Sequence, residues 1–189
     1  MSSAPVLREI VTALGQAGIP YMVVGSFASN LYGNGRGTQD IDLVISANAD
    51  QISALLNYLP KSQYYFDVDA SLEACRRKSM FNILDMEKGW KIDIIFQKPG
   101  PFHQQAFLRR TPAQIDGVDV FALTAEDVIV SKLEWAKMGE SARQIEDVAG
   151  VLKVQQNSFD RHYIEKWVAE FGLTSEWQRA RQLAGLEQT

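Results

Sequence analysis

The sequence is short of cysteine and histidine. Its 189 residues include one cysteine, Cys75, so no disulfide can form within the chain, and two histidines, His103 and His162. No zinc site can be read from ligands this sparse. The sequence also has no apolar run long enough to span a membrane and no charged-then-apolar start of the kind that directs export. These absences predict a cytoplasmic protein with no membrane partner.

An excess of positive charge is missing as well. The 19 lysine and arginine residues are outnumbered by 23 aspartate and glutamate residues, which gives a net charge of −4 and a pI of about 5.2. This balance argues against a protein that coats nucleic acid over a long surface, although a local basic cleft is compatible with it. Hydrophobic residues make up 46% of the chain, enough for one compact unit or for a domain with a helical appendage.

One stretch, residues 21–45, combines a glycine-serine turn with a pair of aspartates. It opens with an apolar run, turns at Gly25 and Ser26 into a short helical segment, and reaches Asp40 and Asp42 after a glycine-rich loop. Side chains alternate along a strand, so both carboxylates are expected on one face. Like charges so close cost free energy unless a cation lies between them. An isolated Asp-x-Asp would be interpreted as a solvated pair, but the surrounding residues favour a site.

Two further features suit the binding of a nucleoside triphosphate. Backbone N–H groups at a helix start favour phosphate, and Gly25 would let a ligand approach the backbone before Ser26. Asp93 lies in an apolar, strand-like run, residues 90–96, where an aspartate without a partner is expensive. An anion-binding turn with three convergent carboxylates fits a nucleotide bound together with magnesium.

This order of motifs resembles the nucleotidyltransferase superfamily related to DNA polymerase beta. Gly25-Ser26, Asp40-x-Asp42 and the later Asp93 match its motifs, over roughly the first two-thirds of the chain. The resemblance implies that Gly25 and Ser26 bind the triphosphate. It also implies that Asp40, Asp42 and Asp93 are catalytic and hold two Mg²⁺ ions, with Mn²⁺ as a substitute. The implied reaction transfers the nucleoside monophosphate of a triphosphate such as ATP to a hydroxyl group.

Other residues are similar to those of the toxin-type members of this superfamily, which act in abortive infection. Arg36 and Thr38, just before the first aspartate, resemble theirs, and so do the downstream residues Lys132 and Asp147. The resemblance implies that these residues contact the nucleotide, with Asp147 orienting it or helping to deprotonate the acceptor. The functional interpretation of Arg36 is contact with a nucleotide phosphate or with the second substrate. For Arg36 a solvated loop residue is an equal alternative. Asp147 would otherwise pair with Arg143, one helical turn away.

The resemblance leaves the acceptor open. A toxin that modifies the end of tRNA, with an antitoxin protein as partner, is the leading interpretation. A nucleotidyltransferase that acts on a small hydroxylated molecule, such as an aminoglycoside, is the alternative. A non-catalytic nucleotide-binding sensor and a structural helical scaffold are the other interpretations. The presence of all three carboxylates favours catalysis over the sensor, and a scaffold would bind no nucleotide.

A second Asp-x-Asp, Asp67 and Asp69, lies in a segment that the pattern leaves ambiguous between helix and strand. No phosphate-binding turn precedes it, so we interpret these residues as exposed carboxylates. The basic run that follows, Arg76-Arg77-Lys78, is interpreted as a solvated face, with contact to RNA or phosphate as the less favoured alternative.

The remaining pattern predicts an α+β fold. Apolar residues recur at helical spacing over residues 5–16, and two strand-like runs around a glycine turn predict a hairpin within residues 80–96. From Thr124, which suits a helix cap, helical spacing continues almost to the end of the chain. We therefore predict a nucleotidyltransferase-type mixed β-sheet with flanking helices over residues 1–122. A C-terminal helical bundle, residues 123–189, is expected to pack on this core.

Overall fold

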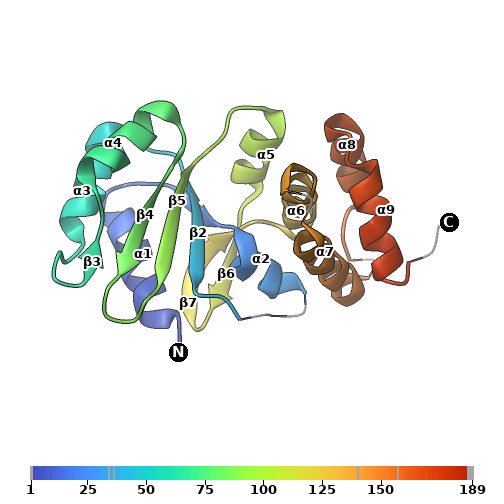
Figure 1. The fold of residues 1–189 in the computed structure, drawn as a ribbon, viewed down its shortest axis with the longest axis horizontal. Coiled ribbons are helices and arrows are strands. Elements are labelled where there is room, and N and C mark those ends of the chain that lie inside the picture. The colour runs from blue at the N-terminus through green and yellow to red at the C-terminus, as the bar shows by residue number, and fades with distance from the viewer. Residues whose placement is uncertain (1, 34, 36, 140, 157, 187–189) are drawn as a thin grey trace. The chain divides into compact units, whose positions relative to one another are not determined.

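The computed structural model describes residues 2–33, 35, 37–139, 141–156 and 158–186, and Figure 1 shows its helices and strands. The chain divides into two compact units. The first unit contains residues 1–27 and 37–122, and the second contains residues 28–36 and 123–189. The predicted division differs from this one at residues 28–36, which group with the C-terminal helices.

The first unit is built on a seven-stranded mixed sheet. Its strands are β1 (Tyr21–Val23), β2 (Asp40–Ile45), β3 (Tyr64–Tyr65), β4 (Met80–Asp85), β5 (Lys91–Phe96), β6 (Thr111–Ile115) and β7 (Val118–Ala122). They lie in the order β3-β4-β5-β2-β1-β7-β6. The pairs β2–β5 and β1–β7 are parallel, and the other neighbours are antiparallel. The predicted hairpin is formed by β4 and β5, and the predicted α+β class is confirmed.

Within the described residues, four helices complete the first unit, together with the start of α2 (Gly25–Tyr32): α1 (Ala4–Gln16), α3 (Ala49–Tyr58), α4 (Val68–Arg77) and α5 (Pro101–Arg109). Helix α1 lies where helical spacing predicted it, and it buries Val6, Ile10 and Leu14. Helix α3 begins with a capping box, in which Asn48 and Gln51 satisfy each other's backbone N–H groups. It packs against α1 and α4 (Figure 1).

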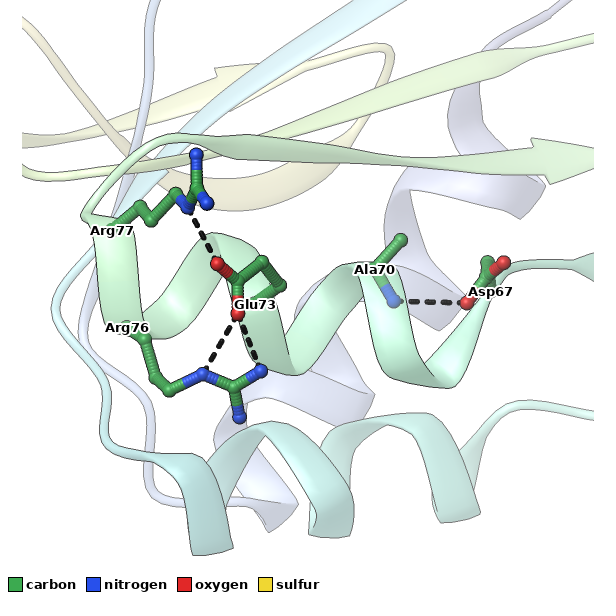
Figure 2. Close-up of polar contacts among 5 residues, drawn as sticks. All are labelled: Asp67, Ala70, Glu73, Arg76 and Arg77. Atoms are coloured by element: carbon green, nitrogen blue, oxygen red, sulfur yellow. Dashed lines mark hydrogen bonds and ion pairs between the residues drawn. The ribbon is translucent and has the colours of Figure 1, made fainter.

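The segment that the sequence left ambiguous is helix α4, shown in Figure 2. The Asp67 carboxylate caps it by accepting a hydrogen bond of 2.9 Å from the Ala70 N–H. Near its end, Glu73 accepts hydrogen bonds from both Arg76 and Arg77 (Figure 2). The hydrogen bond from Arg76, followed by that from Arg77, lowers the pKa of Glu73. This Asp-x-Asp therefore begins a helix, and two of the three basic residues share the single carboxylate of Glu73 on that helix.

The second unit consists of α6 (Ala125–Gly139), α7 (Ala142–Gln155), α8 (Arg161–Phe171), α9 (Thr174–Leu183) and the end of α2. The Tyr32 hydroxyl of α2 donates a hydrogen bond of 2.8 Å to the Leu123 carbonyl, and the Gln155 side chain donates one of 3.0 Å to the Tyr32 carbonyl. These bonds explain why residues 28–36 group with the helices. None of the helices in the described residues is long and apolar enough to cross a membrane.

Candidate functional site

The three candidate aspartates lie on one face of the sheet. Strands β2 and β5 are parallel, with Asp42 opposite Asp93 and Asp40 opposite Lys91. Residues paired across neighbouring strands point to the same side, and residues two apart on a strand share a face. The structure therefore brings Asp40, Asp42, Lys91 and Asp93 to one face, which we call the carboxylate face.

Burial of the apolar residues fixes this arrangement. Ile41 and Leu43 of β2 are fully buried, as are Ile92 and Ile94 of β5. The aspartates between them must therefore point away from that core. A shift of one residue in either strand would bury carboxylates and expose isoleucines, so the apolar pattern sets the register of the charged groups. Asp93 is only 8% exposed even on its own face.

Asp93 is held by two donors on the sheet. The Lys91 ammonium lies 2.9 Å from its Oδ2 atom, and the Asn82 side-chain amide of β4 donates a hydrogen bond of 2.5 Å to its Oδ1 atom. The hydrogen bond to Asp93 raises the pKa of Lys91. Partial desolvation opposes that rise, and the negative charges of Asp93, Asp40 and Asp42 add to it. The ammonium group thus lies in the field of all three carboxylates.

The glycine-serine turn touches the carboxylate face through Gly25. This glycine has a φ of +61°, and a Cβ atom placed on it would overlap Oδ2 of Asp42 and lie 2.7 Å from its Cγ atom. The preceding residue, Val24, donates its N–H to the Asp42 carbonyl at 2.9 Å. Because α2 begins at Gly25, the first N–H groups of this helix lie beside Asp42. The buried Ser26 follows immediately.

The carboxylates fit metal ions that arrive with a nucleotide. Among the described residues, no group of three or more His, Cys, Asp or Glu side chains is arranged to hold a metal ion. Mg²⁺, however, is usually bound by one or two carboxylates together with phosphate oxygens and water. Asp42 and Asp93 lie side by side on neighbouring strands, with their backbones about 5 Å apart. Asp40 is two residues before Asp42 on β2, so their Cα atoms are about 7 Å apart. Because Gly25 has no side chain, the Asp42 carboxylate can occupy the space that a Cβ atom would take.

The remaining candidates are distributed over the chain. Thr38 precedes β2, and its hydroxyl accepts a hydrogen bond of 3.1 Å from the Asp40 N–H. Arg36 lies outside the described residues. Lys132 of α6 and Asp147 of α7 belong to the second unit, where they form a largely buried ion pair of 2.6 Å. Contact of these residues with a nucleotide stays a prediction.

Asn82 is the residue at this site that sequence reasoning missed. It lies between the buried Phe81 and Ile83, so alternation alone puts its side chain on the exposed face of β4. Its position opposite Asp93 depends on how β4 pairs with β5. The alternation was a usable signal, but the partner could be found only with the register.

Several solved structures share this architecture. The antibiotic-resistance factor ANT(2'')-Ia matches with a TM-score of 0.59 and 15% identity, over 96% of this chain and 98% of its own. A nucleotidyltransferase-like protein from Paracoccidioides brasiliensis matches at 0.54 and 17%, over 93% of each chain. The lincosamide antibiotic adenylyltransferase LnuA, bound to lincomycin, matches at 0.54 and 11%, over 81% of this chain and 98% of its own.

No protein-family model and no curated protein matches the sequence. At identities of 11–17% the structural likeness speaks for the fold alone, and it covers 81–96% of this chain and 93–98% of the chains it resembles. Together with the strand order and the flanking helices, it shows that this chain has the α+β fold of the nucleotidyltransferases.

Proposed function

We propose that this protein is a magnesium-dependent nucleotidyltransferase that moves a nucleoside monophosphate from a nucleoside triphosphate to a hydroxyl group of a small molecule. One observation carries the proposal: the Asp42 carboxylate lies opposite Asp93 and against the bare Cα of Gly25. A triphosphate bound at the turn would therefore have its reacting phosphate beside the carboxylates.

Each part of the site has a distinct role in this proposal. Ser26 and the N–H groups at the start of α2 would bind the terminal phosphates. Asp40, Asp42 and Asp93 would hold two Mg²⁺ ions, which when bound activate the attacking hydroxyl and neutralise charge on the leaving group. The acceptor oxygen then bonds to the α-phosphorus as the bond to the bridging oxygen breaks, and pyrophosphate leaves. Thr38 would support this by fixing the start of β2 at Asp40.

Three residues outside this cluster are proposed to assist. Lys132 would add positive charge near the triphosphate, and Asp147 would orient the nucleotide or accept the proton of the acceptor hydroxyl. Arg36 would contact a phosphate group from the loop before β2. These roles come from the resemblance to toxin-type nucleotidyltransferases.

Charge favours a small acceptor over RNA. The chain carries a net charge of −4, and Arg76 and Arg77 both pair with Glu73. RNA-binding surfaces need rows of positive charge that can meet phosphates. Two proteins of similar fold point the same way, since LnuA is a lincosamide antibiotic adenylyltransferase and ANT(2'')-Ia has been solved with adenylyl-2''-tobramycin. A toxin that modifies tRNA, with an antitoxin as partner, is the competing interpretation.

The test is a transfer assay with all four nucleoside triphosphates labelled at the α-phosphate, in the presence of Mg²⁺. Acceptors are lincomycin, tobramycin and total tRNA, each supplied separately. The proposal predicts pyrophosphate release and label on a small molecule. Label on tRNA would support the toxin interpretation, and nucleotide binding without transfer to any acceptor would support a sensor.

Two variants separate catalysis from loss of structure. Asp42→Asn removes a proposed metal ligand and is expected to lower the transfer rate by at least about 100-fold. Asp69→Asn is the matched control, because it makes the same chemical change at an exposed position of the other Asp-x-Asp, on α4. Both variants are expected to keep the wild-type far-ultraviolet circular dichroism. Wild-type transfer by the folded Asp42→Asn variant would disprove the assignment.

A further inference from the structure

The Lys91 side chain holds a position on the carboxylate face that a metal ion would also use. Its ammonium group lies 2.9 Å from Oδ2 of Asp93 and extends from the position opposite Asp40. Asp42 lies opposite Asp93 on the same face. A positive charge therefore lies against Asp93, one of the carboxylates that the proposed function assigns to divalent ions.

The two donors on Asp93 differ in how easily they can give way. Asn82 is neutral, and its amide holds Oδ1, so it can orient the carboxylate without opposing a cation. Lys91 is positively charged, holds Oδ2, and has a side chain that is 43% exposed, whereas the Asp93 side chain is 11% exposed. A flexible lysine with this exposure can move its ammonium into water at small cost.

We propose that Lys91 is an internal counter-ion of the carboxylate face, which competes with divalent metal for Asp93 and so sets the metal affinity of the site. The inference rests on the proposed function, because it takes Asp42 and Asp93 as metal ligands. Two cations at the same carboxylate oxygen repel each other, so a metal ion that binds Oδ2 would weaken or displace the ammonium contact. Without metal, the positive charge of Lys91 offsets the repulsion between the paired aspartates. Because its ammonium group can move away, a divalent cation can take its place.

The test is a Mn²⁺ titration of the full chain at low ionic strength, where screening is weakest, with the unbound ion measured by electron paramagnetic resonance. Lys91→Met removes the charge and keeps most of the apolar stem. It is expected to bind Mn²⁺ about five-fold more tightly than the wild type, the upper end for a partly exposed ion pair. Lys91→Arg keeps the charge and is expected to bind Mn²⁺ with nearly wild-type affinity.

Lys61→Met is the matched control, since it removes the same charge from an exposed turn between α3 and β3. Thermal melting gives a second readout, because a purely structural role of Lys91 would not change how much Mn²⁺ raises the melting temperature. Without metal, Lys91→Met should melt below the wild type, and Mn²⁺ should recover more of its melting temperature than that of Lys61→Met. Lys91→Gln serves as the charge-removing variant if Lys91→Met does not fold.

Failure of the role of Lys91 can be distinguished from failure of the proposed metal site. Unchanged or weaker Mn²⁺ binding by Lys91→Met, or tightening no larger than that of Lys61→Met, would overturn the role of Lys91. If Asp42→Asn abolishes Mn²⁺ binding in that same case, the proposed function stands without it. If Asp42→Asn binds Mn²⁺ like the wild type, or if the wild type binds no Mn²⁺ either alone or with a non-hydrolysable nucleoside triphosphate present, the metal site fails and the inference fails with it.

Discussion

At the scale of single residues, the site depends on the absence of a side chain. Gly25 leaves room for the Asp42 carboxylate, and its φ of +61° is a conformation that residues with a Cβ rarely adopt. The glycine thus serves two purposes: it allows the turn into α2 and it lets a charged group of β2 come close to that turn. Its role as a phosphate-binding residue was expected from the sequence, but its packing against Asp42 was not.

Gly25→Ala should damage the site more than the fold. The new methyl group would push the Asp42 carboxylate out of place, so we expect Mn²⁺ and nucleotide affinity to fall by at least about ten-fold. The strained backbone should cost about 1 kcal/mol of the free energy of unfolding. Titration calorimetry and urea unfolding measure the two effects.

Gly117→Ala separates the two contributions. Gly117 has a similar φ of +74°, but a Cβ atom placed there would meet nothing within 4 Å. This variant should lose similar stability and keep its affinity for nucleotide and metal. Equal loss of affinity in both variants would show that the contact with Asp42 does not matter.

At the scale of elements, a partly buried hydrogen bond joins α1 to β3. The Tyr64 hydroxyl donates to the Glu9 carboxylate at 2.8 Å, and Tyr64 is 2% exposed. Burial, followed by the hydrogen bond to Glu9, raises the pKa of Tyr64 strongly. The folded protein therefore keeps this proton at a pH at which the unfolded chain has lost it.

That difference makes stability fall in alkaline solution. An unfolded tyrosine ionises near pH 10, so the stability from this group is fully present below that pH. Above it, the free energy of unfolding should drop by up to about 1.4 kcal/mol per pH unit for this one group.

Tyr64→Phe should lose about 1 kcal/mol of the free energy of unfolding at pH 7 and show a shallower decline above pH 10. Tyr65→Phe, at the exposed neighbouring position, should follow the wild-type curve in urea unfolding at each pH.

The ion pair between α6 and α7 should show strong coupling. The exposed fractions of the Lys132 and Asp147 side chains are 6% and 11%, and Lys132 also donates to Gln144 at 3.0 Å. Lys132→Met would remove the ammonium group that lies 2.6 Å from the largely buried Asp147 carboxylate, at a cost of about 3 kcal/mol. The double variant Lys132→Met with Asp147→Asn should cost at least about 1 kcal/mol less than the two single changes summed.

The control for that cycle is the exposed ion pair of α8. Arg161 and Glu165 have side chains that are 47% and 42% exposed, and their coupling should stay below about 0.5 kcal/mol. Urea unfolding gives all of these energies. Additive effects at Lys132 and Asp147 would mean that the pair contributes little to holding the two helices together.

Local patterns were enough for the regular elements and for part of the site. Periodicity predicted α1, the β4–β5 hairpin and the C-terminal helices, because each buries one clear apolar stripe or face. The two-residue strand β3 has too few positions to show alternation. The segment that forms helix α4 was ambiguous between helix and strand because both of its ends consist of charged residues, which cap the helix or form ion pairs on it. The aspartates were found because their motif can be recognised in the sequence, whereas the amide of Asn82 could be assigned to Asp93 only from the register of β4 with β5.

At the scale of the whole molecule, the chain forms two compact units that share helix α2. A Cβ atom on Gly33, just after α2, would lie 2.9 Å from the Val151 backbone nitrogen and 3.1 Å from the Gly150 carbonyl carbon. Backbone atoms cannot yield as a flexible side chain can. Gly33 is therefore a packing residue of the second unit.

Gly33→Ala should destabilise the second unit selectively, by about 2 kcal/mol. Native-state hydrogen exchange should show faster exchange in α7 and unchanged protection in β2 and β5, because compact units open separately. Gly37→Ala, where a Cβ atom would meet nothing within 4 Å, should have little effect. Equal acceleration in both units would mean that they unfold as one.

The most direct measurement is a crystal structure of the protein with Mn²⁺ and a non-hydrolysable nucleoside triphosphate, recorded at the manganese absorption edge. We predict an anomalous peak about 2.0–2.4 Å from carboxylate oxygens of Asp42 and Asp93, with the triphosphate at Ser26 and the start of α2. A nucleotide bound without manganese at these carboxylates, or bound elsewhere on the chain, would contradict the account.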